Sequence, residues 1–186
     1  MRLRGSGKFD RDANCDHWGR GVGGYFGARL QQAGAEVHFV ARGAHLAALR
    51  TNGLTVESPL GNIHLPHVNV TDNPGDIGRA DMVWLSVKLW DMEAAVRSMR
   101  PLIGPDTGII SFQNGVQKDD VLRAAFGEKA VMGGVAYIAT NIDRPGVIKH
   151  TGTMQRLIFR RIRWSAIAAG RSAPRRMPSA AASTRS

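Results

Sequence analysis

A glycine-rich stretch near the N-terminus has the residue types and spacing of a phosphate-binding turn. Residues 19–42 read G-R-G-V-G-G-Y-F-G-A-R-L-Q-Q-A-G-A-E-V-H-F-V-A-R, with glycines at the start of a predicted helix. A pyrophosphate can bind the amides of a helix N-terminus only where no side chain blocks its approach, which glycine allows. The stretch therefore favours a dinucleotide site, although a glycine-rich turn is weak evidence by itself in a chain with 22 glycines.

An arginine follows the strand predicted after this helix. Residues 37–41 read as a short strand, and Arg42 comes directly after it. NAD-binding folds usually carry Asp or Glu at this point to bind the ribose 2′-hydroxyl, whereas a guanidinium suits the 2′-phosphate of NADP. The alternative interpretation is a solvated arginine that leaves a strand. With the glycines before it, Arg42 favours NADP as the cofactor.

Two further polar residues are predicted at the ends of buried strands. The apolar run of residues 81–88 ends in Lys88, and the strand of residues 108–112 leads into Q-N-G-V, which contains Asn114. Because ligands of parallel sheets bind outside the carboxyl ends of the strands, Lys88 and Asn114 should face one crevice. The asparagine amide can donate to and accept from a ribose hydroxyl or a carboxamide. The alternatives are a solvated lysine and an ordinary Asn-Gly turn.

The elements that position these residues alternate between helices and strands. Such alternation predicts an α/β fold with a Rossmann-like, doubly wound parallel sheet. Asp91 is the predicted N-cap of the third helix. The predicted helices cover residues 23–33, 43–52, 92–99 and 118–126, and the predicted strands cover residues 37–41, 54–57, 62–65, 68–70, 81–88, 108–112, 130–137 and 146–150.

The first strand of this fold is not recognisable in the sequence. Residues 1–18 should contain a run of about five apolar residues before the glycine turn. They read M-R-L-R-G-S-G-K-F-D-R-D-A-N-C-D-H-W, so we expect the first strand to be degraded and missing from the sheet. With one choice of codons for Asn14–Arg20, a one-base shift would encode an apolar strand and the first glycines. This suggests that the segment is translated out of frame.

The positive charge of the chain belongs to its two ends. The net charge is +10, yet residues 21–159 hold thirteen basic and twelve acidic side chains, while residues 160–186 hold seven Arg and no acid. The basic tail has no apolar periodicity and is predicted to be disordered, so we expect no nucleic-acid partner. No stretch is apolar enough to cross a membrane and a single cysteine excludes an internal disulfide, which together predict a cytoplasmic protein.

Two histidines three residues apart could suggest a metal site. His64 and His67 lie in the predicted strand region with Pro66 between them. A structural or catalytic metal needs at least three protein ligands, and the sequence offers no third ligand nearby. We therefore interpret both as solvated histidines and predict no metal.

From Gly21 to about Phe159 the chain resembles the ketopantoate reductase family, the NADPH-dependent 2-dehydropantoate 2-reductases. The resemblance rests on five ordered motifs, G-V-G-G-Y-F-G-A-R-L, F-V-A-R-G-A-H-L-A-A-L-R-x-N-G-L, S-V-K-L-W-D, Q-N-G-V and P-G-V-I-K-H. In the family register Gly23 is the third fingerprint glycine, and Trp18 and Arg20 stand in place of the first two. The resemblance implies that the cofactor is bound by a set of residues along these motifs: Gly21, Gly23, Gly24, Arg42, Lys88, Asn114 and Thr140.

The same resemblance divides the chain into three parts. Residues 1–20 form an aberrant segment, residues 21–159 the NADP-binding domain, and residues 160–186 an aberrant basic tail that a one-base shift would return to a family-like reading. In the family, a lysine of a C-terminal helical domain donates a proton while hydride reduces a 2-oxoacid, 2-dehydropantoate. That domain is missing here, so we expect no catalytic residue and an inactive chain. The open alternatives are a noncatalytic NADP-binding module, a reductase of another 2-oxoacid, and a nucleic-acid-binding protein, which the sequence favours least.

Overall fold

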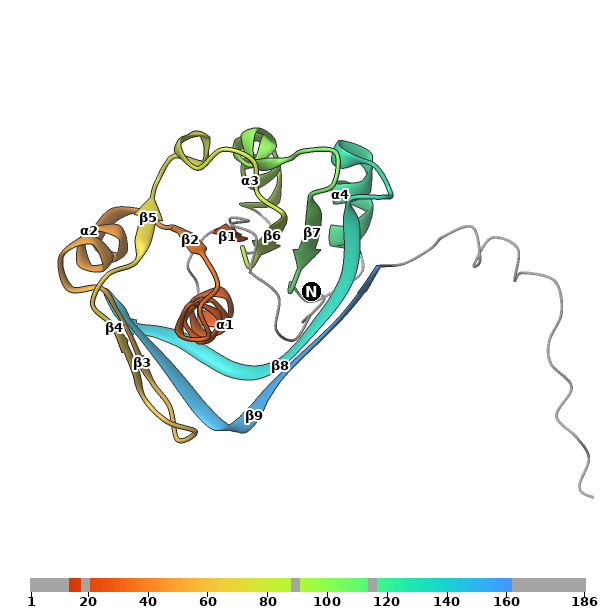
Figure 1. The fold of residues 1–186 in the computed structure, drawn as a ribbon. Helices are drawn as coiled ribbons and strands as arrows, with labels where there is room; N and C mark the ends of the chain where they lie inside the picture. The colour runs from red at the N-terminus through yellow and green to blue at the C-terminus, as the bar shows by residue number, and fades with distance from the viewer. Residues whose placement is uncertain (1–13, 18–20, 88–90, 114–116, 162–186) are drawn as a thin grey trace, which may run out of the picture.

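The computed structural model describes residues 14–17, 21–87, 91–113 and 117–161. Within these residues nine strands form one sheet in the order β4-β3-β9-β8-β7-β6-β1-β2-β5 (Figure 1). The strands are β1 Asn14–His17, β2 Val37–Val40, β3 Leu54–Glu57, β4 Ile63–Leu65, β5 Asn69–Thr71, β6 Met82–Leu85, β7 Gly108–Ser111, β8 Val131–Arg144 and β9 Val147–Arg161. The helices are α1 Gly21–Gln32, α2 Gly43–Asn52, α3 Met92–Ser98 and α4 Gln117–Phe126, with short 3₁₀ helices η1 Pro74–Asp76 and η3 Arg100–Leu102.

The predicted α/β class and Rossmann-like core are confirmed, but the sheet is mixed rather than wholly parallel. β5, β2, β1, β6, β7 and β8 are parallel neighbours. The pairs β3–β4 and β8–β9 are antiparallel, and β9 also pairs in parallel with β3. A two-residue turn at Pro145 and Gly146 joins β8 to β9, and a connection this short forces the two strands to run in opposite directions.

The expectation that the first strand is missing from the sheet is wrong. β1 pairs in parallel with β2 on one side and with β6 on the other. Its four residues, N-C-D-H, lack the apolar pattern from which a buried strand is predicted. Main-chain amides and carbonyls make the ladder, so a segment between two formed strands can pair whatever its side chains are.

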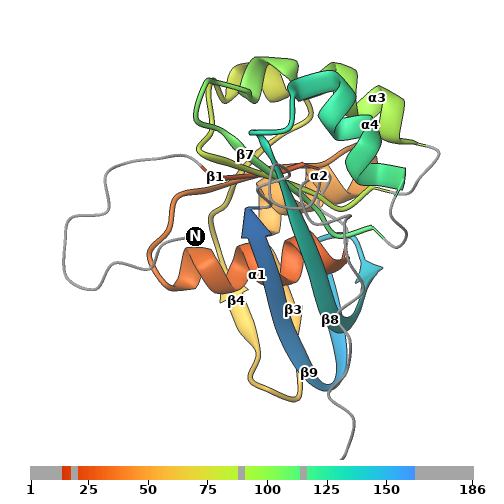
Figure 2. The ribbon, with the colours of Figure 1, turned by 90° about the vertical axis from the view of Figure 1, so that its right-hand side faces the viewer.

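The β8–β9 hairpin is much longer than the sequence predicts. Strands were expected at residues 130–137 and 146–150, whereas β8 has 14 residues and β9 has 15. β9 continues to Arg161, and Arg160 pairs with Gly133. In the view of Figure 2 the two strands run side by side away from β7, with α1 packed across them. An antiparallel pair can keep one face in solvent, so charged residues along the strands do not end the pairing.

Helix α1 is held between the parallel strands and the β8–β9 hairpin (Figure 1). Tyr25 and Phe26 are buried in the core on this side. A Cβ atom on Gly24 would lie 2.2 Å from Cδ1 of Ile148, and one on Gly27 would lie within 3 Å of the Phe39 ring. Since any side chain at Gly24 or Gly27 would overlap β9 or β2, these glycines allow the close packing of helix on strand.

Helices α3 and α4 cover the opposite face of the parallel strands (Figure 1). Along β6, Val83 and Leu85 face this second core, whereas Trp84 belongs to the core around α1. Asp91 is the N-cap of α3, as predicted, but its side chain makes no capping hydrogen bond. Its backbone is already helical, while a capping side chain is normally carried by a residue with extended backbone angles.

We expect the buried hydroxyl of Tyr25 to stabilise the packing of α1 on β9. It donates a hydrogen bond of 2.6 Å to Oε1 of Gln155, and its ring lies 4.7 Å from that of His150. The substitution Tyr25→Phe should lower the free energy of unfolding by about 1 kcal/mol, because the hydrogen bond is lost while the ring remains. Tyr137→Phe is the matched control, since the side chain of Tyr137 is half exposed on β8. Urea unfolding would contradict this prediction if both variants were as stable as the parent chain.

Candidate functional site

The first turn of α1 lies directly against β8, and this contact brings two of the predicted site residues together. Gly21 is the first residue of α1 and is buried. A Cβ atom on Gly21 would lie 2.7 Å from both the carbonyl carbon and the carbonyl oxygen of Thr140, and 2.8 Å from the amide nitrogen of Asn141. Only glycine fits here without moving main chain.

Thr140 contributes a polar atom that lacks a protein partner. Its Oγ1 atom is buried and has no hydrogen bond with any described residue. A buried hydroxyl without a partner costs free energy, so such an atom beside a helix N-terminus is a natural contact for a ligand. Gly23 is also buried in the first turn, whereas Gly24 faces Ile148, so its position is explained by packing. A direct cofactor contact by Gly23 or Gly24 stays a prediction.

Arg42 lies at the carboxyl end of β2, where it was predicted. It is exposed, and its backbone is extended, with φ −137° and ψ 160°, at the N-cap of α2. The side chain does not cap the helix. The preceding amide, that of Ala41, donates to the carbonyl of Thr71, so the ends of β2 and β5 are tied together. Arg42 therefore lies between the end of β2, which is tied to β5, and the start of α2.

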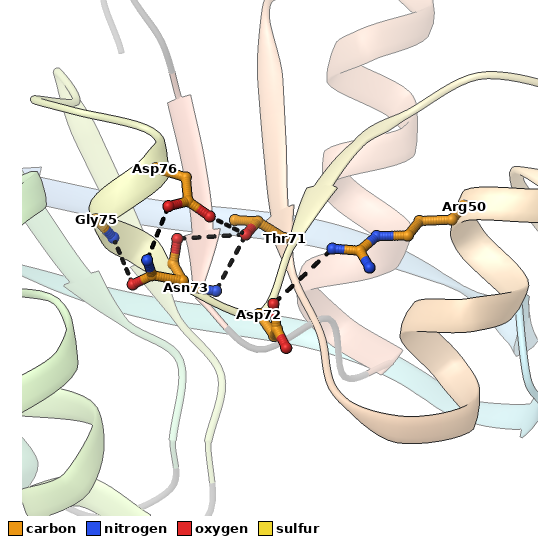
Figure 3. Close-up of polar contacts among 6 residues, drawn as sticks. All are labelled: Arg50, Thr71, Asp72, Asn73, Gly75 and Asp76. Atoms are coloured by element: carbon orange, nitrogen blue, oxygen red, sulfur yellow. Dashed lines mark hydrogen bonds and ion pairs between the residues drawn. The ribbon is translucent and has the colours of Figure 1, made fainter.

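A polar network holds the chain beyond β5, next to the end of β2 (Figure 3). Asp76 accepts hydrogen bonds from Thr71 Oγ1 at 2.9 Å and from Asn73 Nδ2 at 2.8 Å. Asn73 Oδ1 in turn accepts from the amide of Gly75. Arg50 of α2 lies 3.8 Å from Asp72. These short-range contacts fix the turn into η1, next to the end of β2 that carries Arg42.

The remaining two predicted site residues, Lys88 and Asn114, lie outside the described residues. The residues directly before them in the chain, Val87 and Gln113, are described, and Gln113 Nε2 donates to the carbonyl of Val87. β6 and β7 are parallel neighbours, with Leu85 opposite Ser111. The strand ends that lead to the two predicted residues are thus side by side.

Several buried polar atoms near these strand ends have no hydrogen-bond partner among the described residues. They are Trp84 Nε1 and Ser86 Oγ on β6 and just after it, and Gln113 Oε1 just after β7. Trp84 and Ser86 are two residues apart, so they share the α1 face of the sheet. Buried unpaired donors and acceptors near a helix N-terminus suit the hydroxyls, amide and phosphates of a dinucleotide. The residues present therefore fit a nicotinamide dinucleotide.

Lys118 is a polar residue near this edge that the sequence analysis missed. It is only 6% exposed, and its Nζ donates to the carbonyls of Ser111, at 2.9 Å, and Gln113. Burial lowers the pKa of Lys118 from its ordinary value, and the carboxylate of Asp119 opposes that shift. A signal was present in the sequence, because a cation in the first turn of a helix is unfavourable to the helix dipole and implies a specific partner.

The stability of the fold should depend on pH through Lys118. The lysine gives up its proton at a lower pH in the folded chain than in the unfolded chain, whose pKa is near 10.5. Between the pKa of Lys118 in the folded chain and its pKa in the unfolded chain, the unfolded chain binds more protons than the folded chain. The free energy of unfolding should therefore increase with pH in this window and be lower below it. Urea unfolding of the parent chain and Lys118→Met from about pH 8 to about pH 10.5 measures this. The parent should gain stability relative to the variant, and a constant difference would contradict the prediction.

The histidines form no metal site in the part of the chain that the structure describes. No group of three His, Cys, Asp or Glu side chains is arranged to hold a metal ion there. His64 Nδ1 instead lies 3.0 Å from Thr55 Oγ1 on the neighbouring strand. Of the helices described, none is long and apolar enough to cross a membrane.

Comparisons with known proteins agree with this geometry. The profile of the family described as "Ketopantoate reductase PanE/ApbA" matches residues 20–164. An uncharacterised oxidoreductase of Bacillus subtilis, YkpB, is 32% identical over 139 residues, which are 75% of this chain and 45% of the relative. A 2-dehydropantoate 2-reductase of Archaeoglobus fulgidus is 37% identical over 132 residues, which are 70% of this chain and 41% of the relative.

Solved structures show the same likeness. The crystal structure of 2-dehydropantoate 2-reductase from Geobacter metallireducens superposes with a TM-score of 0.75 and 34% identity, over 79% of this chain and 48% of that protein. The chain spans about half the length of the curated relatives it matches. The family is one of oxidoreductases that use NADH or NADPH. The profile match and these relatives show that the chain belongs to the ketopantoate reductase PanE/ApbA family.

Proposed function

We propose that this chain is the NADPH-binding part of a 2-dehydropantoate 2-reductase of coenzyme A biosynthesis. The observation that carries the proposal is the placement of the helix start at Gly21 against Thr140, with buried unpaired polar atoms at the carboxyl ends of the adjacent strands. A pyrophosphate would lie on the amides of the first turn of α1. Arg42, at the end of β2, would bind the 2′-phosphate that distinguishes NADPH from NADH.

When bound, the cofactor would supply hydride to the ketone carbon of a small 2-oxoacid. The residues of this chain would bind and orient the two molecules. Lys88 and Asn114 would contact the nicotinamide ribose and the substrate, and the Thr140 hydroxyl would supply a hydrogen bond near the helix start. Each of these groups can donate to an oxygen that carries negative charge. Protonation of the product alkoxide would fall to a lysine of the helical domain that the resemblance to the family implies.

We propose that these 186 residues by themselves bind cofactor and do not turn over substrate. We also propose that residues 1–20 and 160–186 are read out of frame, since the family profile, which matches residues 20–164, leaves most of both segments unmatched. Sequencing of the gene across both segments tests this part of the proposal. Support would come from one-base shifts that open an apolar first strand and a downstream helical domain, either as corrections of the sequence or, if the bases stand as given, as mutations in a decayed gene. A gene in which no one-base shift opens these segments would refute it.

The proposed binding function is tested with the purified 186-residue chain. Titration with NADPH, followed by the emission of the bound nicotinamide, should show saturable binding at one site. Addition of 2-dehydropantoate should then cause no loss of NADPH absorbance. An absence of saturable binding would refute the cofactor assignment, and steady NADPH oxidation would refute the statement that the chain is inactive.

Two other readings use the same residues. A noncatalytic NADP-binding module would bind NADPH without any 2-oxoacid effect, even in a frame-corrected, full-length protein. A reductase of another 2-oxoacid would show turnover in that protein with a substrate other than 2-dehydropantoate. The Bacillus subtilis relative is described only as an uncharacterised oxidoreductase, which is consistent with a substrate other than 2-dehydropantoate. A panel of 2-oxoacids with the frame-corrected protein separates the three.

A further inference from the structure

Two side chains outside the predicted site join the ends of β6 and β7. Gln113 Nε2 donates to the carbonyl of Val87, so the amide spans the gap between the two strand ends. Farther back, the amide of Phe112 donates to the carbonyl of Leu85 at 3.0 Å. Among the described residues, the side-chain bond therefore continues the ladder by one step beyond the last main-chain bond between these strands.

Lys118 holds the same strand end from the side of α4. Its Nζ donates to the carbonyls of Ser111 and Gln113, which are the last residue of β7 and the residue two positions later. The side chain is buried, and the carboxylate of the neighbouring Asp119 acts on its charge. A buried ammonium is costly unless it is hydrogen-bonded, so the two carbonyl contacts offset the cost of burying Nζ at this strand end.

We propose that Gln113 and Lys118 are positioning residues of the cofactor site: together they fix the carboxyl ends of β6 and β7, where Ser86 Oγ and Gln113 Oε1 are buried without a partner among the described residues. The inference rests on the proposed function. Val87 and Gln113, which the side-chain bond joins, lie two residues beyond the ends of β6 and β7, so this bond fixes the part of the chain that carries those unpaired atoms. Gln113, Lys118 and the carbonyls that they bind are called the strand-end clasp.

The fold alone does not require the side-chain hydrogen bonds of the clasp. β6 and β7 are already paired along their length, and the second core holds them from the α3–α4 side. Bonds added beyond the paired region fix only the strand ends. Ligand contacts need positions accurate to about 0.5 Å, and supporting hydrogen bonds around a site supply that accuracy.

The experiment compares NADPH affinity among Lys118→Met, Lys118→Arg, Gln113→Met and a control. Methionine is as long as glutamine and one atom shorter than lysine, and it donates no hydrogen bond, whereas arginine retains donors for two carbonyls. Lys129→Met is the matched control, because Lys129 is exposed in the α4–β8 loop. All titrations are made at a temperature at which circular dichroism shows each variant to be fully folded, so a loss of stability alone cannot change the measured affinity.

We expect Kd for NADPH to rise about tenfold in Lys118→Met and in Gln113→Met, by analogy with the supporting hydrogen bonds of other sites. Lys118→Arg should stay within about threefold of the parent, and Lys129→Met should match it. If the parent chain binds NADPH and both methionine variants bind it with a Kd within twofold of the parent's, the inference is overturned, whereas the proposed function is not. Equal losses in Lys118→Met and Lys118→Arg would overturn it too, because rescue is absent. A parent chain that binds no NADPH would overturn the proposed function, and this inference with it.

Discussion

Replacing Arg42 with alanine should weaken NADPH binding by about 10- to 100-fold and leave NADH binding unchanged. The guanidinium is expected to make charge-assisted hydrogen bonds to the 2′-phosphate, which are each worth roughly 1.5–3 kcal/mol. NADH lacks that phosphate, so its affinity should not depend on Arg42. The measurement is a pair of titrations with the two cofactors, each followed by the fluorescence of the reduced nicotinamide.

Arg50→Ala is the matched control for Arg42. Arg50 is another exposed arginine of the same region, carried by the last turn of α2, and it lies 3.8 Å from Asp72 (Figure 3). A surface ion pair of this kind contributes little, so NADPH affinity should change less than twofold. If Arg42→Ala weakened both cofactors equally, the arginine would serve the fold of the site and not the choice of NADPH.

Gly21→Ala should abolish detectable NADPH binding and destabilise the chain by about 1–3 kcal/mol. The added methyl group would lie 2.7 Å from main-chain atoms of Thr140, and main chain cannot rotate away as a side chain can. Either α1 or β8 has to move, and both elements carry predicted cofactor contacts. Urea unfolding and NADPH titration of the same preparation measure the two effects.

Gly104→Ala provides the comparison for Gly21→Ala. A Cβ atom on Gly104 would meet Cδ of Arg79 at 3.2 Å, and this flexible side chain can shift. The variant should unfold within about 0.5 kcal/mol of the parent and bind NADPH normally. Unchanged NADPH affinity in Gly21→Ala would mean that the approach of α1 to β8 is not part of the site.

Local signals in the sequence predict the middle of this fold accurately. The predicted bounds of α2 and β3 agree with the structure residue for residue. Both ends of α2 are marked by glycines with positive φ, Gly43 and Gly53, which side-chain-bearing residues adopt at a cost. The failures have the opposite character. β1 forms through main-chain pairing with β2 and β6, which are distant in the sequence. The unpredicted parts of β8 and β9 extend an antiparallel pair whose charged, solvent-facing residues give no apolar pattern.

The candidate site shows the same difference between features that are local in the sequence and contacts that are not. The sequence placed Arg42 correctly, because the end of a strand followed by a charged residue is a local feature. The contact of Gly21 with Thr140 joins segments far apart in the chain, and only the three-dimensional arrangement shows it. The clasp was missed because Lys118 was interpreted as part of an ordinary helix start, although its charge was unfavourable at that position.

The position of α1 between early and late strands has a consequence for biosynthesis. The hydrogen bond from Tyr25 to Gln155 spans 130 residues, and the β8–β9 hairpin that covers this side of α1 is made after all the other strands. A nascent chain must therefore hold the apolar face of its first helix uncovered while most of the domain is translated, at roughly 5–20 residues per second. Contacts between residues so far apart in the sequence slow folding and leave apolar surface exposed to aggregation for longer. Yield in the cell should accordingly depend on chaperones that bind the emerging chain.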